Sequence, residues 1–260
     1  MSASLWLAYD HYGYALLAVV GTFAAVSGVY RLAHHPRCAG WLLSWQGVAP
    51  PFINILGVLF GLTLAFLAND TWSAHDRAIR AVYREADAMR TTLALSQNVP
   101  APLASQVRGA LAQYAQASVD EWGWLAQRTA NPAVADRADA LLTLIASAGV
   151  REALGANVQT LLLDQIVTMR DERDQRVTLS QTHVNPLKWL GMAFLGLLTL
   201  LSVAVVHIER PRALLAAVVL FAFGAAPTAA IVLIQGNPFL APVGVTSAPL
   251  QAVLNGLTAR

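Results

Sequence analysis

Four long apolar stretches divide the chain, and each approaches the roughly 20 residues that a helix needs to cross a bilayer. Their approximate limits are Tyr12 to Leu32, Phe52 to Ala68, Leu187 to Val206, and Ala213 to Ile234. Polar connections join the first stretch to the second and the third to the fourth, and polar clusters of this kind are too costly to hold in hydrocarbon. The pattern therefore predicts two transmembrane hairpins.

The charged residues gather between the hairpins, where apolar residues recur at spacings of three and four, as in helices. Pro100, Pro102 and Pro132 break this part of the chain. We expect helices over about 71–96, from there to about 128, over 133–148 and over 151–182, the first continuous with the second apolar stretch. After the fourth stretch we expect a weak amphipathic helix over 247–257, lying against the domain or the membrane surface.

The fold class predicted is an all-α membrane protein, with four transmembrane helices in two hairpins and a helical extramembrane domain between the second and third. The predicted division is 1–69 for the first hairpin, 70–185 for the helical domain, 186–234 for the second hairpin and 235–260 for a C-terminal tail. Of the residues, 56% are hydrophobic and 12% are charged, whereas about 25% are charged in a soluble domain. The N-terminus lacks a basic region and a cleavage site, so we expect no removable signal peptide.

Composition and motifs exclude several classes of function. The net charge is +2 and basic residues are interspersed with acids, which does not fit a nucleic-acid-binding face. Cys38 is the only cysteine, so no internal disulfide or cysteine-based metal set can form. His34 and His35 are adjacent and point to different faces, and no hydrolase, nucleotide-binding or metalloprotease motif occurs. We expect no enzyme activity, no cofactor and no metal.

Charged residues of the domain are interpreted as solvated. The run from Arg170 to Arg176 mixes both signs, as in a water-exposed helix with pairs at three and four. Asp120, Glu121 and Asp164 are isolated carboxylates and are expected at the surface.

The second apolar stretch has two different faces. Its bulky face is a pore-lining candidate that can equally meet lipid or a neighbouring helix, and it comprises Ile53, Leu56, Phe60, Thr63 and Leu67. Its small face favours packing within the subunit over a narrow pore, and it comprises Asn54, Gly57, Gly61, Ala65 and Ala68.

Three polar residues of this stretch are further candidates. Asn54 can form a polar ring or pair with another helix, and Asn69 and Asp70 lie where the helix leaves the bilayer. A ring of Asp70 would repel anions unless Arg77 or Arg173 neutralises it, and the alternative is an interfacial pair with a nearby arginine.

Charge counting does not settle which side the domain faces. The short connections carry Arg31, Arg37, Arg210 and Arg212 against Glu209, which favours a domain outside the cytosol. The domain side carries its own membrane-adjacent bases, and long loops cross regardless of charge; these bases are Arg77, Arg80, Arg84, Arg173, Arg176 and Lys188.

The order of landmarks resembles the bestrophin-like family of membrane proteins, which is distantly similar to the bestrophin anion channels. The resemblance rests on FLANDTW at 66–72, on Glu85, Ala86, Tyr114, Val119, Glu121 and Trp122, on Arg173, Arg176, His183, Pro186 and Trp189, and on Asn237, Pro238, Phe239 and 245–250. It covers most of the chain from Phe52 onward.

The resemblance implies a homo-oligomeric, pentameric channel for inorganic anions such as chloride, in which the second transmembrane helix lines an apolar neck. It also implies a multi-pass protein of the bacterial inner membrane with a cytoplasmic helical domain extending the pore. Asp171, Glu172 and Asp174 alternate with arginines rather than forming the dense acidic run of a calcium clasp, so calcium gating is not expected. The alternative function is a non-conducting membrane sensor or scaffold whose helical domain recruits a partner.

Overall fold

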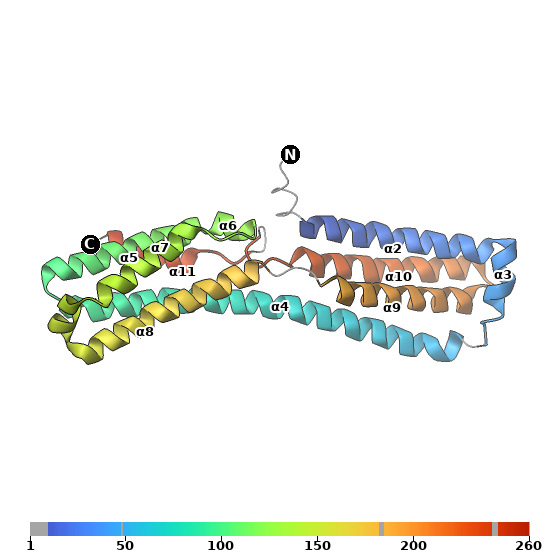
Figure 1. The fold of residues 1–260 in the computed structure, drawn as a ribbon. Coiled ribbons are helices and arrows are strands. Elements are labelled where there is room, and N and C mark those ends of the chain that lie inside the picture. The colour runs from blue at the N-terminus through green and yellow to red at the C-terminus, as the bar shows by residue number, and fades with distance from the viewer. Residues whose placement is uncertain (1–9, 48, 182–184, 241–243, 260) are drawn as a thin grey trace. The chain divides into compact units, whose positions relative to one another are not determined.

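The computed structural model describes residues 10–47, 49–181, 185–240 and 244–259, and within these ranges it contains helices and no strand. The predicted all-α class is confirmed (Figure 1). Contacts divide the chain into two units. We call residues within 9–72 and 183–236 the membrane unit, and residues within 73–182 and 237–260 the helical unit.

The membrane unit contains four helices long and apolar enough to cross a bilayer, as predicted. They are α2 (Asp10–His34), the first part of α4 (Ala49–Leu95), α9 (Pro186–His207) and α10 (Pro211–Ile234). Between α2 and α4 lies a short helix that the sequence reading did not anticipate, α3 (Pro36–Leu43), whose N-terminus is capped by His35. Trp41 and Trp45 lie at or just beyond its C-terminal end and are 57% and 50% exposed, as amphipathic rings in the headgroup zone would be.

Proline and asparagine explain where these helices begin. Pro50, Pro186 and Pro211 occupy first-turn positions, where a missing backbone N–H costs nothing. The side chain of Asn185 accepts hydrogen bonds from the backbone N–H groups of Leu187 and Lys188, which caps α9.

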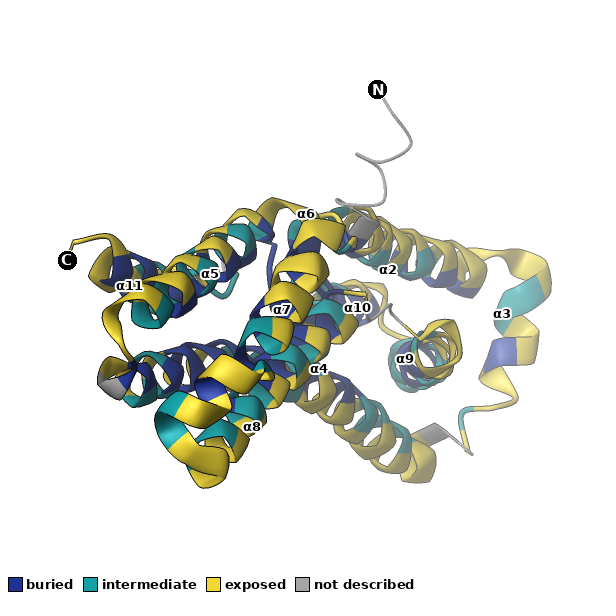
Figure 2. Ribbon diagram, turned by 60° about the vertical axis from the view of Figure 1, so that its left-hand side comes forward, coloured by how far each residue is buried: buried dark blue, intermediate teal, exposed yellow. Residues whose placement is uncertain are grey.

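Two apolar clusters hold the membrane unit together. The larger joins α2, α9 and α10, with Val29, Leu200 and Leu214 among its buried members. The smaller attaches α4 and comprises Leu64, Leu67, Ala68, Met192, Ala229 and Val232. Only 17% of the apolar window of α4 is buried, against 39% for α10, so the other helices leave much of α4 uncovered (yellow in Figure 2).

The helical unit contains the rest of α4, a 3₁₀ turn at Ser96–Asn98 and five further helices. These are α5 (Ala101–Asp120), α6 (Trp122–Ala126), α7 (Pro132–Ile145), α8 (Ala148–Ser180) and α11 (Ala248–Thr258). Met89, Leu111, Leu141 and Ile166 lie in its core, and Leu250 of α11 packs there too.

The predicted continuity of the second apolar stretch with the first domain helix is confirmed, because α4 is a single helix of 47 residues. The predicted helix ending near Arg128 is wrong in one respect: it is interrupted at Glu121, where α5 ends and α6 begins. Thr182, the predicted end of the fourth helix, lies outside the described residues. Within α8, Gly155 has φ +77° and ψ 162°, a conformation that only glycine adopts readily, and it marks a kink.

Candidate functional site

The structure places the bulky face of α4 largely toward the other helices of the membrane unit. Leu67 is buried in the smaller cluster, and the Phe60 ring lies 5.7 Å from that of Phe221 on α10. Ile53, Leu56 and Thr63 are half-buried at the edge of this contact. The Thr63 hydroxyl donates to the Leu59 carbonyl, so it is already satisfied within its own helix.

The opposite face of α4 is uncovered in this chain. Its large apolar residues are 49 to 68% exposed, and they are Ile55, Val58, Leu62 and Phe66. We call these four residues the outer face of α4. On its flank, Asn54, Gly61 and Ala65 of the small face are also exposed, while Gly57 is half-buried and Ala68 is buried. The small face therefore packs within the subunit only in part.

Polar residues lie at both ends of this uncovered surface. Asn54 and Asn69 are exposed, and Asn54 makes no hydrogen bond to any residue that the structure describes. The Asp70 carboxylate is paired with the Lys188 ammonium group on α9, at 2.7 Å. Arg77 and Arg173 were the neutralising partners of Asp70 suggested by the sequence; within the membrane unit the start of α9 brings a lysine beside the carboxylate.

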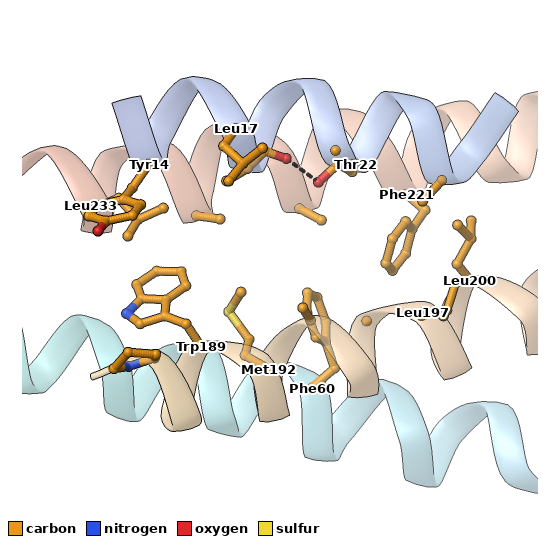
Figure 3. A pocket seen from close by; sticks show the side chains of 18 residues that line it. Tyr14, Leu17, Thr22, Phe60, Trp189, Met192, Leu197, Leu200, Phe221 and Leu233 are labelled. Carbon is orange, nitrogen blue, oxygen red and sulfur yellow. Dashed lines mark hydrogen bonds between the residues drawn. The ribbon is translucent and has the colours of Figure 1, made fainter. Parts of the chain in front are cut away.

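A cavity of about 540 Å³ lies between α2, α4, α9 and α10. Figure 3 shows Trp189, Met192 and Phe60 facing Leu17 and Thr22 of α2 across it. Its lining is almost entirely apolar, and no sequence feature that we considered predicted it.

In the helical unit, charged residues from α4, from α8 and from the corner between α5 and α6 form a buried cluster. The Arg176 side chain is fully buried, and its guanidinium donates to both carboxylate oxygens of Glu85, at 2.6 and 3.0 Å. The Tyr114 hydroxyl donates to the same carboxylate at 2.8 Å. Because charge-assisted bidentate pairs have strict geometry, this pair fixes α8 against α4 at one position.

A second pair extends the cluster. The Arg173 guanidinium donates to the fully buried Glu121 carboxylate at 2.6 Å and to the Asn131 carbonyl at 3.0 Å. Glu121 also accepts from the Asn131 backbone N–H, and one of its oxygens lies 3.6 Å from the Arg176 guanidinium. Two carboxylates thus oppose two guanidinium groups, which offsets the cost of burying each charge.

These contacts correct two predictions. Glu121 is not a surface carboxylate, and the run from Arg170 to Arg176 is solvated on one face only. Arg173 and Arg176 continue the buried stripe of Leu162, Ile166 and Met169 at helical spacing. That spacing is the one feature of the sequence that indicated burial of the two arginines. The mixed charges alone do not distinguish ion pairs along one helix from ion pairs between helices.

The cluster changes the titration of its members. Burial, followed by the negative charge of Glu85, raises the pKa of the Tyr114 phenol well above its ordinary value near 10. Burial by itself lowers the pKa of Arg176, but the charge and hydrogen bonds of Glu85 outweigh it, so that pKa is raised. Both groups therefore keep their protons at neutral pH.

Trp122 lies between the cluster and the C-terminal segment and contacts both. The Trp122 indole N–H donates to the Val245 carbonyl at 2.7 Å, its ring packs edge-to-face on Phe239, and the Arg176 guanidinium lies 4.9 Å from the ring centroid. The Asn237 amide donates to the carbonyls of Leu125 and Ala126. Several of the residues that suggested the family resemblance thus meet here, whereas 66–72, Pro186 and Trp189 belong to the membrane unit and His183 lies outside the described residues.

The described part of the chain contains no group of three or more histidine, cysteine, aspartate or glutamate residues placed to hold a metal ion. Protein partners satisfy most polar atoms of the cluster, although Nη1 of Arg176 has no hydrogen-bond partner among the described residues, and the paired geometry positions α8 against α4.

Comparisons with known proteins agree on one relationship. The family model described as the Bestrophin-like domain matches residues 20–250. Among solved structures, the chain is similar to a mutant of a bacterial Bestrophin homolog from Klebsiella pneumoniae, with a TM-score of 0.60 and 14% sequence identity. That match covers 95% of this chain and 98% of the other, and at this identity it shows a shared fold. Comparison with curated proteins gives no match.

Proposed function

This chain belongs to the Bestrophin-like domain family, and we propose that it is a homo-oligomeric channel for inorganic anions such as chloride in the bacterial inner membrane. In this proposal five copies of α4 surround the conduction path, and their apolar residues form the neck. The helical unit lies in the cytosol. Family membership, the shared fold and the uncovered surface of α4 support the proposal.

The observation that carries the proposal is that the uncovered side of α4 bears both large apolar residues and a polar one, Asn54. The exposed hydroxyl groups of Ser27 and Thr228 in the membrane unit are satisfied within their own helix, by the carbonyls four residues earlier. The Asn54 amide has no such partner, and an unpaired amide facing lipid is costly. An axis filled with water, or a neighbouring copy of α4, provides the missing partner.

We propose that the outer face of α4, Ile55, Val58, Leu62 and Phe66, lines the neck. These side chains point away from the contacts that attach α4 to α9 and α10, which leaves them free to face an axis. Asn54 and Asn69 bound this surface, and their separation of 15 positions along the helix spans about 22 Å. The sequence-predicted face of Ile53, Leu56, Phe60, Thr63 and Leu67 is the alternative lining, and the packing of Phe60 and Leu67 within the subunit weighs against it.

Cysteine accessibility distinguishes the two faces. In a Cys38→Ser background, Val58→Cys and Leu62→Cys test the outer face, and Leu56→Cys and Thr63→Cys test the alternative. Liposomes containing each variant are assayed for chloride flux before and after a charged, water-soluble thiol reagent. We expect the reagent to block flux only in the outer-face variants, because only groups bathed by the aqueous path react.

Two results would change the assignment. Block confined to the Leu56→Cys and Thr63→Cys variants would transfer the lining to the sequence-predicted face. Liposomes that pass no halide at any pH or voltage would remove the channel itself, and the sensor or scaffold function would then be favoured.

Particle mass provides a test that does not depend on transport. A pentamer has about five times the chain mass of 27.7 kDa, and we expect that mass in detergent, with a ring in projection. A monomer or dimer that carries one stoichiometric partner protein would contradict the channel and support the scaffold.

The native cysteine reports the orientation of the domain. Cys38 lies in α3, before α4. In the proposed topology α4 crosses the membrane once, which puts Cys38 and the helical unit on opposite sides of the bilayer. For a cytosolic helical unit, an impermeant maleimide labels Cys38 from the periplasm. It labels a Ser105→Cys, Cys38→Ser variant only after the inner membrane is permeabilised. The reverse pattern would place the helical unit outside.

A further inference from the structure

We propose that the cavity in the membrane unit binds one acyl chain of a membrane phospholipid. The cavity is bounded by all four membrane helices and has a volume of about 540 Å³. It is an opening in the side of the unit rather than part of the outer face of α4, so it is separate from the proposed neck.

Small residues on facing helices create the space. Gly21 and Ala25 of α2 lie across from Ala193 of α9 and Ala225 of α10, and side chains of this size cannot fill the gap between them. A Cβ atom added at Gly21 would meet no other atom within 4 Å, so open space lies beside this glycine. At Gly196 the gap is closed, because the Phe60 ring already reaches the position where a Cβ atom would lie.

The chemistry of the lining favours hydrocarbon over water. The Thr22 hydroxyl is used, since it donates to the Ala18 carbonyl at 2.7 Å (Figure 3). The helical backbone around it is bonded to itself, and a water molecule needs two to four polar partners to remain in a cavity. A dry apolar cavity of this kind binds apolar ligands.

The length and the ends of the cavity match a chain in one leaflet. Along α2 the lining extends from Tyr14 to Ala25, and 11 residues of helix span about 16 Å. That is close to half of the roughly 30 Å hydrocarbon core of a bilayer. Tyr14 and Trp189 mark one end, and amphipathic rings of this kind favour the headgroup zone.

A cation stands beside that end. Lys188 precedes Trp189 in the first turn of α9, and its side chain is 56% exposed although it is paired with Asp70. A lysine at this level attracts a lipid phosphate. The site therefore takes a phospholipid with its headgroup near Lys188 and Trp189 and one chain extending toward Phe221 and Leu200.

A photoreactive lipid tests the proposal directly. Full-length protein is reconstituted with phosphatidylglycerol that carries a diazirine in one acyl chain, irradiated, and mapped by mass spectrometry. We expect labelling of cavity residues such as Met192 in the wild-type protein. Labelling of Leu220, which is 72% exposed outside the cavity, measures contact with bulk lipid in every sample.

Gly21→Leu and Gly28→Leu form a matched pair of variants. Both glycines are exposed on α2 with open space beside them, but only Gly21 lines the cavity. Losing contact with two chain methylenes weakens binding about tenfold, so Gly21→Leu is expected to lower Met192 labelling, relative to Leu220, by about that factor. Gly28→Leu is expected to leave the ratio unchanged, and circular dichroism melts verify that both variants fold.

Three outcomes would overturn the proposal. The first is no labelling of cavity residues in the wild-type protein, as expected if a second copy of the chain fills the space. The second is an equal ratio in both glycine variants. If Gly21→Leu does not fold, Ala193→Leu is used to fill the cavity from another wall. The third outcome is that this variant leaves the ratio of Met192 to Leu220 labelling unchanged. None of these measurements depends on ion conduction.

Discussion

Replacing Glu85 by glutamine tests whether the buried cluster holds the helical unit together through charge. The substitution keeps the size of the side chain and an oxygen that can accept from Arg176 or Tyr114. It removes one of the two negative charges that oppose Arg173 and Arg176, and thereby leaves a net positive charge in a buried site.

Removing one partner of a buried pair costs about 3–5 kcal/mol. We expect a value near the lower limit, about 3 kcal/mol, because the glutamine still accepts a hydrogen bond and Glu121 remains 3.6 Å from Arg176. For a unit of this size, a loss of that magnitude lowers the midpoint of thermal unfolding by on the order of 10 °C.

The assay is urea unfolding of the full-length protein in detergent, followed by near-ultraviolet circular dichroism, which reports on the packing of the aromatic side chains, Trp122 among them. The control is Asp139→Asn, which breaks the Arg170–Asp139 pair on the surface of the same unit. Its side chains are 43% and 62% exposed, and such pairs contribute less than about 1 kcal/mol.

A double variant completes the test. Glu85→Gln with Arg176→Met removes both charges of the pair, and we expect it to lose less stability than the two single variants added together. If Glu85→Gln costs no more than Asp139→Asn, or if the double variant is strictly additive, the argument that paired charges position α4 and α8 is refuted.

Three further predictions concern single residues of the helical unit, each measured by the same urea unfolding. Burial raises the pKa of Tyr114 in the folded state, so the stability that it provides is present below its ordinary pKa near 10 and is lost as the pH rises above it; Tyr114→Phe should flatten this alkaline decline, and an unchanged decline would exclude the phenol as its cause. Gly155→Ala should cost about 1–3 kcal/mol because φ is +77° there, whereas Gly149→Ala on the same helix should be neutral or stabilising; equal effects would contradict the strained conformation. Asn237→Ala should cost about 1–3 kcal/mol, since two carbonyls and the Phe239 N–H lose their partner, and a change below 0.5 kcal/mol, typical of a surface site, would show that the amide is not needed.

The membrane helices were predictable because the information that specifies them is local. About twenty consecutive apolar residues are enough to indicate a span, and Pro186 with Asn185 marks the start of α9 within a few residues of sequence. The continuity of α4 was also predictable, since no proline or glycine occurs from 73 to 99. The short helix α3 was missed because its eight residues form only about two turns, which is shorter than the window over which helical periodicity is recognised.

The buried cluster was not predictable from charge pattern, because its partners are far apart in the chain. Arg176 and Glu85 are separated by 91 residues, and Arg173 and Glu121 by 52. A run of alternating charges is compatible with pairs along its own helix or with pairs to other helices. Only the packing of α8 against α4 and the α5–α6 corner selects the second arrangement.

The faces of α4 show the same limit. Helical spacing grouped Ile53, Leu56, Phe60, Thr63 and Leu67 on one side of the helix. Spacing does not indicate whether that side meets a neighbouring helix, lipid or a pore. The positions of α9 and α10 turned Phe60 and Leu67 toward the subunit and left Val58 and Leu62 uncovered. Which of these sides meets water in an oligomer remains a prediction.

The sequence by itself determined which segments are apolar enough to cross a membrane, which segments carry the charges, and where the membrane helices begin. Hydropathy and helix capping are properties of a few turns of chain. Tertiary structure alone decided which charges are buried, which side of α4 is free, and where small residues leave a cavity. Those properties depend on neighbours contributed by distant parts of the chain, and no local pattern of residues specifies them.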